Sequence, residues 1–259
     1  PNLQPMYSAL GYTINWTQLL DTGGTVFSDS LFQIRDAFSE RELPPLLYDK
    51  VKDVDGGKDD SLSLYKMKLQ FPFAVQSNVE SLEASYDKFA TQNDLFRAVS
   101  GEEQPLITDI SGQIQNGTAT LAVGENTQVL YFYGTNTGEN PVTIYVNGTP
   151  VKIPASYYYE NEQYPSDFCN GLVCLGAFKN ETVTVQFATN AAVTDLHLGM
   201  LDYALLEQTA DTLKNQGMQV TDLKQKNSGA SFAVKDAKAG SVFVPVPYDE
   251  NWKCKVNEE

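Results

Sequence analysis

Short runs in which apolar and polar residues alternate recur along the whole chain, and a period of two is typical of a half-buried β-strand. In the first third, two such runs lie at 31–38 and 62–69, and Pro44-Pro45 and a polar, Gly-rich connection at 53–60 separate them. Seven more runs follow, at 119–123, 128–133, 142–146, 182–187, 195–198, 230–234 and 241–246. The pattern predicts a chain built mainly from short strands.

One tight turn among these strands is well specified by its residues. Asn147-Gly148 stands between the apolar pairs Ile144/Val146 and Val151/Ile153. A two-residue hairpin loop of this type needs φ > 0 at both central positions, which Asn and Gly adopt most readily. The sequence therefore predicts a β-hairpin centred on residues 147 and 148.

Two segments show helical spacing instead. The first begins after Asp87, which can cap a helix, and stops before Gly101; its apolar residues are Phe89, Leu95, Phe96 and Val99. In the second, Asp202 is placed to cap the start and Gly217 the end; its periodic residues are Leu205, Leu206, Thr209, Ala210 and Leu213. We expect the second helix to interrupt the run of strands.

These elements together predict the α+β class. We expect a mixed α/β subdomain over residues 1–105, followed over 106–259 by a mainly antiparallel β-sandwich with an inserted helix. With 42% hydrophobic residues the chain can bury a sizeable core. No stretch approaches the roughly 20 apolar residues that a membrane-spanning helix requires.

Charge narrows the possible partners. The chain carries 33 Asp and Glu against 18 Lys and Arg, a formal net charge of −15. Nucleic-acid binding needs a basic surface that displaces counterions from phosphates, and no basic stripe stands out, so we exclude nucleic acid. The chain starts at Pro1 without an initiator Met or a signal segment, which leads us to expect a piece of a longer protein.

The number and spacing of the cysteines and the histidine do not indicate a metal site or a redox motif. Cys169 and Cys174 are separated by four residues, which suits a turn-closing disulfide as well as it suits two buried thiols. A single histidine and the lack of a second thiol pair argue against structural zinc. The acids at 53–60 do not match the ligand positions of an EF-hand. We predict no metal site and no cofactor.

Catalytic signatures are also missing. His197 is the only histidine, and the chain has no Gly-x-Ser-x-Gly elbow and no papain-like cysteine context to supply its nucleophile. Its alternation with Leu196 and Leu198 predicts a strand residue that faces outward or is partly buried. We assign no catalytic residue.

The densest aromatic and acidic cluster is Tyr157-Tyr158-Tyr159 with Glu160, Glu162 and Tyr164. Aromatic faces stack on the C–H patches of sugars while carboxylates accept from their hydroxyls, so Tyr157, Tyr159 and Glu160 are candidates for glycan binding. The alternative is that alternate tyrosines fill the sandwich core and the acids face water. A glycosidase pair would need two carboxylates at a defined separation, which the sequence does not specify.

Three segments, in order, resemble the YfhO family of bacterial membrane proteins. The first is Ser28-Asp-Ser-Leu-Phe-Gln-Ile-Arg with the following Glu40–Tyr48, and the second is the helical segment from Asp87 to Glu102. The third is the C-terminal stretch from Ser241 through Pro247-Tyr-Asp and Trp252 to Asn257. They span residues 28 to 257. Asp87-Lys88 and Asn251 depart from the pattern, which has Asn-Pro and Gly at these places.

The resemblance implies a multi-spanning protein similar to C-type glycosyltransferases, which use a polyprenyl-phosphate sugar on the outer face of the membrane. Such proteins add sugars to lipoteichoic acid or related envelope polymers. The fragment would then be an extracytoplasmic domain before a final membrane helix. Its partners would be a cell-envelope glycopolymer or glycolipid and the transmembrane part of its own chain. The catalytic acid would lie among the membrane helices, so we expect the fragment alone to be inactive.

Within that resemblance, Trp252 with Tyr248 and Asp249 forms a second candidate glycan site. Trp252 could be a platform for the acceptor sugar, or it could anchor the core beneath a turn that Pro247-Tyr248-Asp249 opens. The acidic surface would keep the domain away from anionic lipid headgroups. Two other functions stay open: a secreted carbohydrate-binding or adhesion module, and a glycosidase that uses Glu160 or Glu162.

Overall fold

The structure is a computed structural model, and it describes residues 31–34, 44–55, 61–69, 71–79, 87–136, 143–151, 172–188, 193–226, 229–244 and 253–257. Within these ranges, strands predominate and every pairing between named strands is antiparallel. Two α-helices accompany them. The described part of the chain is therefore β-rich with two helices, as the predicted α+β class requires.

Two four-stranded sheets form the centre of the molecule. The first has the order β10-β7-β12-β5, with bounds Val173–Phe178, Gln128–Asn136, Val193–Asp202 and Ile107–Asp109. The second has the order β6-β11-β8-β9, with bounds Thr118–Val123, Glu181–Ala188, Thr143–Val146 and Thr149–Val151. A short 3₁₀ turn, η1, spans Ser111–Gln113 between β5 and β6.

The two sheets pack face to face, as the alternation in the sequence predicts. In β11 the buried residues Val183, Val185 and Phe187 alternate with more exposed neighbours. They belong to one hydrophobic cluster with Leu130 and Phe132 of β7, on the opposite sheet. This cluster draws residues from both sheets, so the predicted β-sandwich is present.

Both predicted helices and their caps are confirmed. Helix α2 spans Lys88–Ser100; its N-cap is Asp87, whose Oδ1 accepts from Ala90 N at 2.9 Å, and its C-cap is Gly101. Helix α3 spans Tyr203–Gln216, and the side chain of its N-cap, Asp202, accepts from Leu205 N at 3.1 Å. Capping of the first free N–H groups explains why each helix begins where the sequence predicts.

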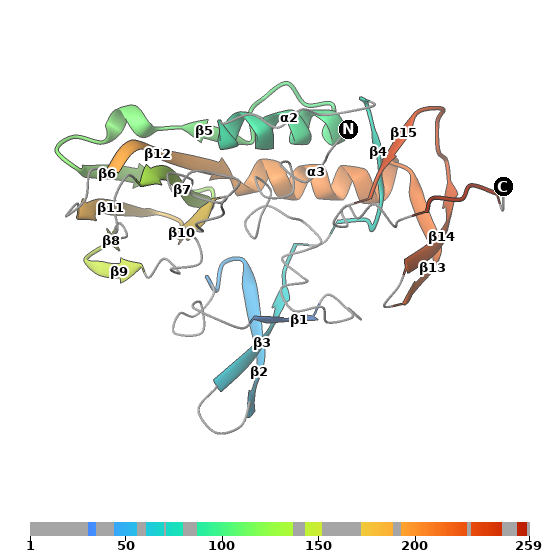
Figure 1. Cartoon of the computed structure of the whole chain (residues 1–259), viewed down its shortest axis with the longest axis horizontal. Helices are drawn as coiled ribbons and strands as arrows, with labels where there is room; N and C mark the ends of the chain where they lie inside the picture. The colour runs from blue at the N-terminus through green and yellow to red at the C-terminus, as the bar shows by residue number, and fades with distance from the viewer. Residues whose placement is uncertain are drawn as a thin grey trace.

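Helix α2 covers the outer face of the first sheet and adds a third layer (Figure 1). Its apolar side packs against β7 and β5 in a second hydrophobic cluster. The approach is close at Gly199 of β12, where a Cβ atom would lie 2.4 Å from Cζ of Phe89. Only glycine leaves room there for the Phe89 ring to lie on the sheet.

The predicted hairpin joins β8 to β9. Asn147 and Gly148 have φ values of 49° and 77°, as the turn type requires. The Asn147 side chain adds a bond of its own, because its Oδ1 accepts from Thr184 N of β11 at 2.8 Å. The turn is thereby fastened to the neighbouring strand.

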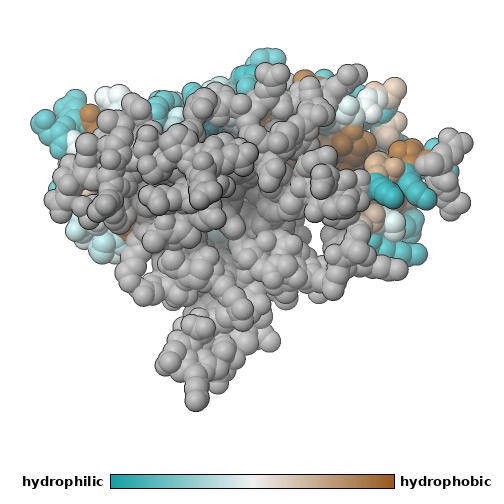
Figure 2. All heavy atoms as spheres, viewed as in Figure 1, coloured by the Kyte–Doolittle hydropathy of each residue, from teal (hydrophilic) through white to brown (hydrophobic). Residues whose placement is uncertain are grey.

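Three smaller sheets lie outside the sandwich. The first has the order β1-β3-β2, with bounds Leu31–Ile34, Ser61–Met67 and Tyr48–Asp55. The second pairs β15 (Ser241–Phe243) with β4 (Val75–Ser77), and the third pairs β13 (Gln219–Lys226) with β14 (Gly229–Lys235). In the view of Figure 2, hydrophobic and hydrophilic residues meet at the end of the molecule that holds β4, β14 and β15.

One boundary in the N-terminal third needs correction. The polar connection predicted over 53–60 begins later, because Asp53, Val54 and Asp55 belong to β2, where they pair with β3. Cross-strand pairing outweighs the low strand propensity of aspartate at this place. The mixed α/β subdomain over 1–105 and its boundary stay predictions. Leu47 and Val75, from before residue 105, share the second cluster with Leu106 and Tyr131.

Candidate functional site

The glycan-site candidates and one cysteine predicted from the sequence lie outside the described residues. They are Tyr157, Tyr159, Glu160, Tyr248, Asp249, Trp252 and Cys169. Cys174 is half-buried on β10. The glycan sites and the disulfide therefore stay predictions.

The structure does fix the points between which the tyrosine-rich segment runs. The last described residue before it is Val151 of β9, the first described residue after it is Leu172, just before β10, and both of these residues are buried. β9 and β10 are edge strands of opposite sheets. Val151 and Leu172, which flank residues 152–171 in the sequence, thus each belong to a hydrophobic cluster.

Among the described residues, the only histidine of the chain takes part in an aromatic cluster. His197 of β12 lies directly opposite Tyr133 of β7 in the strand register. Their rings stack in parallel, with centroids 4.2 Å apart, and the ring of Phe89 meets Tyr133 edge-on at 4.9 Å. Pleating of the strands puts the rings of Tyr133 and His197 on the face that helix α2 covers, where they lie beside Phe89 of that helix. His197 is partly buried, as its alternation with Leu196 and Leu198 predicts.

The Tyr133 hydroxyl ties this cluster to the start of helix α2. It donates to Oδ1 of Asp87 at 3.2 Å, the oxygen that also accepts from Ala90 N. Burial raises the pKa of Tyr133 well above its ordinary value of 10, and the nearby Asp87 carboxylate raises it further. Tyr133 therefore keeps its proton and acts as a hydrogen-bond donor.

The cluster lacks the contacts of a nucleophilic triad. The nearby Ser111 hydroxyl donates to Asp109 Oδ1 and accepts from Leu198 N at 3.0 Å, so its proton is directed at a carboxylate. Nδ1 of His197 is buried and has no hydrogen-bond partner within the described ranges. Asp87 and Asp109 are both exposed. The arrangement does not pair a nucleophile with a base.

A second group of polar side chains, Tyr48, Tyr131, Cys174 and Tyr203, lies on the face of the first sheet that helix α2 covers. Burial raises the pKa of Tyr131 well above its ordinary value, and the neighbouring Cys174, Tyr48 and Tyr203 raise it further. Burial likewise raises the pKa of Tyr48. These hydroxyls stay protonated, so the group is a neutral part of the core that joins the start of β2 to the sandwich.

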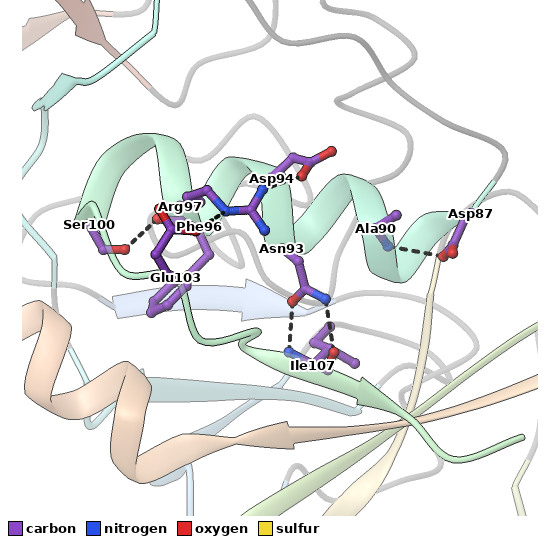
Figure 3. Close-up of polar contacts among 9 residues, drawn as sticks. All are labelled: Asp87, Ala90, Asn93, Asp94, Phe96, Arg97, Ser100, Glu103 and Ile107. Atoms are coloured by element: carbon purple, nitrogen blue, oxygen red, sulfur yellow. Dashed lines mark hydrogen bonds and ion pairs between the residues drawn. The ribbon is translucent and has the colours of Figure 1, made fainter.

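Helix α2 is held over the sheet by a two-point contact (Figure 3). Asn93 Nδ2 donates to the carbonyl of Ile107 at 2.9 Å, and the amide of Ile107 donates to Asn93 Oδ1 at 2.8 Å. One side chain thus gives the edge strand β5 the hydrogen bonds that a further strand would supply. On the exposed side of the helix, Arg97 pairs with Asp94 at 2.8 Å and with Glu103 at 3.6 Å.

The sequence did not predict that Tyr133 and Asp109 lie near His197. It assigned Asp87 only a capping role. No local motif marks them, because their proximity depends on β7 lying beside β12 and on β12 lying beside β5. In the described part of the chain, no three His, Cys, Asp or Glu side chains are grouped so that they could hold a metal ion. Neither described helix combines the length and the apolarity needed to cross a bilayer.

Comparison with known families assigns the chain to a class. A family model of bacterial membrane proteins matches residues 1–259, the whole chain. The chain belongs to this family, the bacterial membrane protein YfhO family, as the three segments quoted above predict. No curated protein and no solved structure matches the chain.

Proposed function

We propose that this chain is the extracytoplasmic domain of a multi-spanning membrane protein that resembles polyprenyl-phosphate-sugar-dependent glycosyltransferases. Its role is to recognise or position the acceptor, a lipoteichoic acid or another cell-envelope polymer, while catalysis belongs to the transmembrane part. The observation that carries the proposal is the match of the YfhO family over all 259 residues.

The described fold suits a binding or scaffolding role. A rigid β-sandwich with both sheets anchored in large hydrophobic clusters can hold loops in fixed positions, and binding residues are commonly placed on such loops. Residues 152–171, which include Tyr157, Tyr159 and Glu160, follow edge strand β9 and precede edge strand β10 in the sequence. We propose these residues, with Trp252, as contacts to the polymer.

The acidic charge of the chain also bears on how it recognises a polymer. At −15 the domain as a whole repels polyphosphate polymers, so recognition of the acceptor rests on stacking and hydrogen bonds to its sugars. No observation favours the secreted module or the glycosidase, since the family is one of membrane proteins.

The test uses the full-length membrane protein in a strain that lacks its own copy. Trp252→Ala is expected to abolish glycosylation of the envelope polymer, while the protein stays as abundant as the wild type. The matched control is Trp16→Ala, which changes the only other tryptophan of the chain and is expected to leave glycosylation unchanged. If Trp252→Ala keeps normal glycosylation, or loses it only because the protein disappears, Trp252 is not an acceptor platform.

A further inference from the structure

The same three residues, Asn-Gly-Thr, form two turns of the second sheet. One is Asn116-Gly117-Thr118, which leads into β6, and the other is Asn147-Gly148-Thr149, which joins β8 to β9. In both turns the asparagine and the glycine have positive φ, 51° and 75° in the first and 49° and 77° in the second. Both asparagines are exposed. The two turns therefore share residue types, backbone conformation and access of the asparagine to water.

The two turns differ in what holds the asparagine side chain. Asn147 Oδ1 accepts from Thr184 N at 2.8 Å, and Asn147 N donates to the Thr184 carbonyl, also at 2.8 Å. The first turn is tied to β11 by its backbone alone, because the carbonyl of Gly117 accepts from Phe187 N at 2.8 Å. The side chain of Asn116 has no hydrogen-bond partner among the described residues. It can therefore rotate, whereas the side chain of Asn147 is held.

An Asn-Gly pair with a rotating side chain can react with itself. The amide nitrogen of Gly117 is the nucleophile, and the side-chain carbonyl carbon of Asn116, Cγ, is the electrophile. Glycine favours this attack because it has no Cβ to obstruct the approach of its nitrogen and no side chain to restrict the backbone rotation that ring closure requires. Within the described ranges the Gly117 amide donates to no acceptor, so it does not have to break a hydrogen bond before it attacks.

We propose that Asn116 is a site of spontaneous deamidation and that Asn147, in the same tripeptide, is protected by Thr184. The Gly117 nitrogen bonds to Cγ of Asn116, the bond from Cγ to Nδ2 breaks, and the Gly117 amide proton leaves with Nδ2 as ammonia. Water then opens the resulting succinimide at either carbonyl, which gives aspartate or isoaspartate. The reaction consumes water alone and involves no change of oxidation state. This inference does not depend on the proposed function.

Deamidation changes the start of an edge strand. It replaces a neutral side chain by a carboxylate, and the isoaspartate product also adds a methylene group to the backbone of the turn. β6 begins directly after this turn, with Thr118 opposite Gln186, and β11 is the only described strand that pairs with it. A longer backbone in the turn shifts the first residues of β6 against that register. We therefore expect the modified chain to unfold at a lower temperature than the unmodified one.

The experiment compares both asparagines in one sample, because cleavage after glutamate places them on different peptides. Residues 104–125 carry Asn116, and residues 140–160 carry Asn147. The folded 259-residue chain is incubated in mildly alkaline buffer, digested at glutamate and analysed by mass spectrometry for replacement of the amide by a carboxyl group. Fragmentation assigns the modified residue and separates isoaspartate from aspartate, which identifies the succinimide route because direct hydrolysis gives aspartate alone.

In the folded chain we expect Asn116 to convert about fivefold faster than Asn147, a factor that corresponds to about 1 kcal/mol for the side-chain hydrogen bond to Thr184 that must break first. The matched control is the same chain unfolded in guanidinium chloride. Thr184 no longer lies beside Asn147 there, so we expect the two identical tripeptides to convert at nearly the same rate. Asn116→Gln, whose longer side chain would have to close a larger ring, is expected to lose the signal from residues 104–125 and to leave that from 140–160 unchanged.

Circular dichroism checks that the incubated chain and the Asn116→Gln variant are folded. A folded chain in which Asn116 keeps its amide while the unfolded chain loses it overturns the proposal, and so do equal rates at the two asparagines of the folded chain. Conversion of Asn116 to aspartate without isoaspartate excludes the succinimide route. A rate ratio that unfolding leaves unchanged shows that Thr184 does not protect Asn147, and it overturns that part of the claim.

Discussion

Replacing Gly199 by alanine tests the packing that holds helix α2 on the sandwich. The new Cβ would lie 2.4 Å from Cζ and 2.5 Å from Cε1 of Phe89, and 2.8 Å from Cγ2 of Ile107. Carbon atoms pack at about 3.5–4.0 Å, so the Phe89 ring has to move by about 1 Å. Phe89 and Ile107 are 2% and 1% exposed, which leaves neither side chain an easy way out.

Overpacking of a filled core costs about 1–3 kcal/mol, and the contact with two buried side chains puts Gly199→Ala at the upper end, about 3 kcal/mol. For a chain of this size we expect the midpoint of thermal unfolding to fall by about 6–12 °C. The free energy of unfolding is measured by urea titration followed by circular dichroism. The matched control is Gly124→Ala, since a Cβ at Gly124 has no neighbour within 4 Å; we expect it to change the free energy by less than about 1 kcal/mol.

A double variant locates the cause of the destabilisation. Phe89→Ala alone is expected to cost about 3–5 kcal/mol because it leaves a cavity. Combined with Gly199→Ala it is expected to cost clearly less than the sum, because the new methyl group enters the space that the ring vacates. A Gly199→Ala protein as stable as the wild type, or strictly additive costs in the double variant, would refute this account of the helix–sheet contact.

Three further substitutions test other parts of the structure. Asn93→Ala removes both hydrogen bonds to the backbone of Ile107, and we expect urea titration to show a loss of about 1–3 kcal/mol; no loss would mean that β5 needs no such partner. Asn147→Ala forces alanine into φ > 0 and removes a side-chain bond, so we expect a loss of about 1–2 kcal/mol, whereas Asn147→Gly, which tolerates that φ, is expected to lose less. Tyr133 has a raised pKa in the folded state, so its contribution to stability is complete below about pH 10 and is lost as the pH rises further. Tyr133→Phe is therefore expected to make the decline of stability above pH 10 shallower by about 1.4 kcal/mol per pH unit, and an unchanged slope would contradict the assignment.

The elements that the sequence predicts well are those with a local physical cause. Asp87 and Asp202 cap helices because an aspartate side chain can accept from free amides two or three residues later, whatever the rest of the fold does. Asn147-Gly148 makes a turn because few other pairs adopt the required φ values. Regular alternation in 182–187 predicts a half-buried strand because successive side chains of a strand point to opposite faces of the sheet.

The strands that the sequence does not predict form because of partners that are far away along the chain. β5 is three residues long and exists because β12 pairs with it. β4 pairs with β15, and its Gln76 also bonds the backbone of Lys238, 162 residues further along the chain. β2 contains five charged residues and is a strand because β3 lies beside it. Such pairings leave no mark within either strand alone.

The same reasoning applies to the aromatic cluster. His197 and Tyr133 stack because β12 and β7 are neighbours with one particular register, which shifts between Thr194 and His197. A one-residue change in that register would put His197 on the other face of the sheet. The sequence predicted the partial burial of His197 from its neighbours, but the identity of its partner needs the sheet order.

The central claim, that this domain lies on the outer face of the membrane, is tested most directly by thiol labelling of intact cells. Cys254 is exposed and forms no disulfide, so a membrane-impermeant maleimide can reach it from its own side of the membrane. In cells that produce the full-length protein, we predict labelling without permeabilisation, and Cys254→Ser is expected to lose that signal. Labelling of Cys254 only after the membrane is opened would place the domain in the cytoplasm and contradict the account.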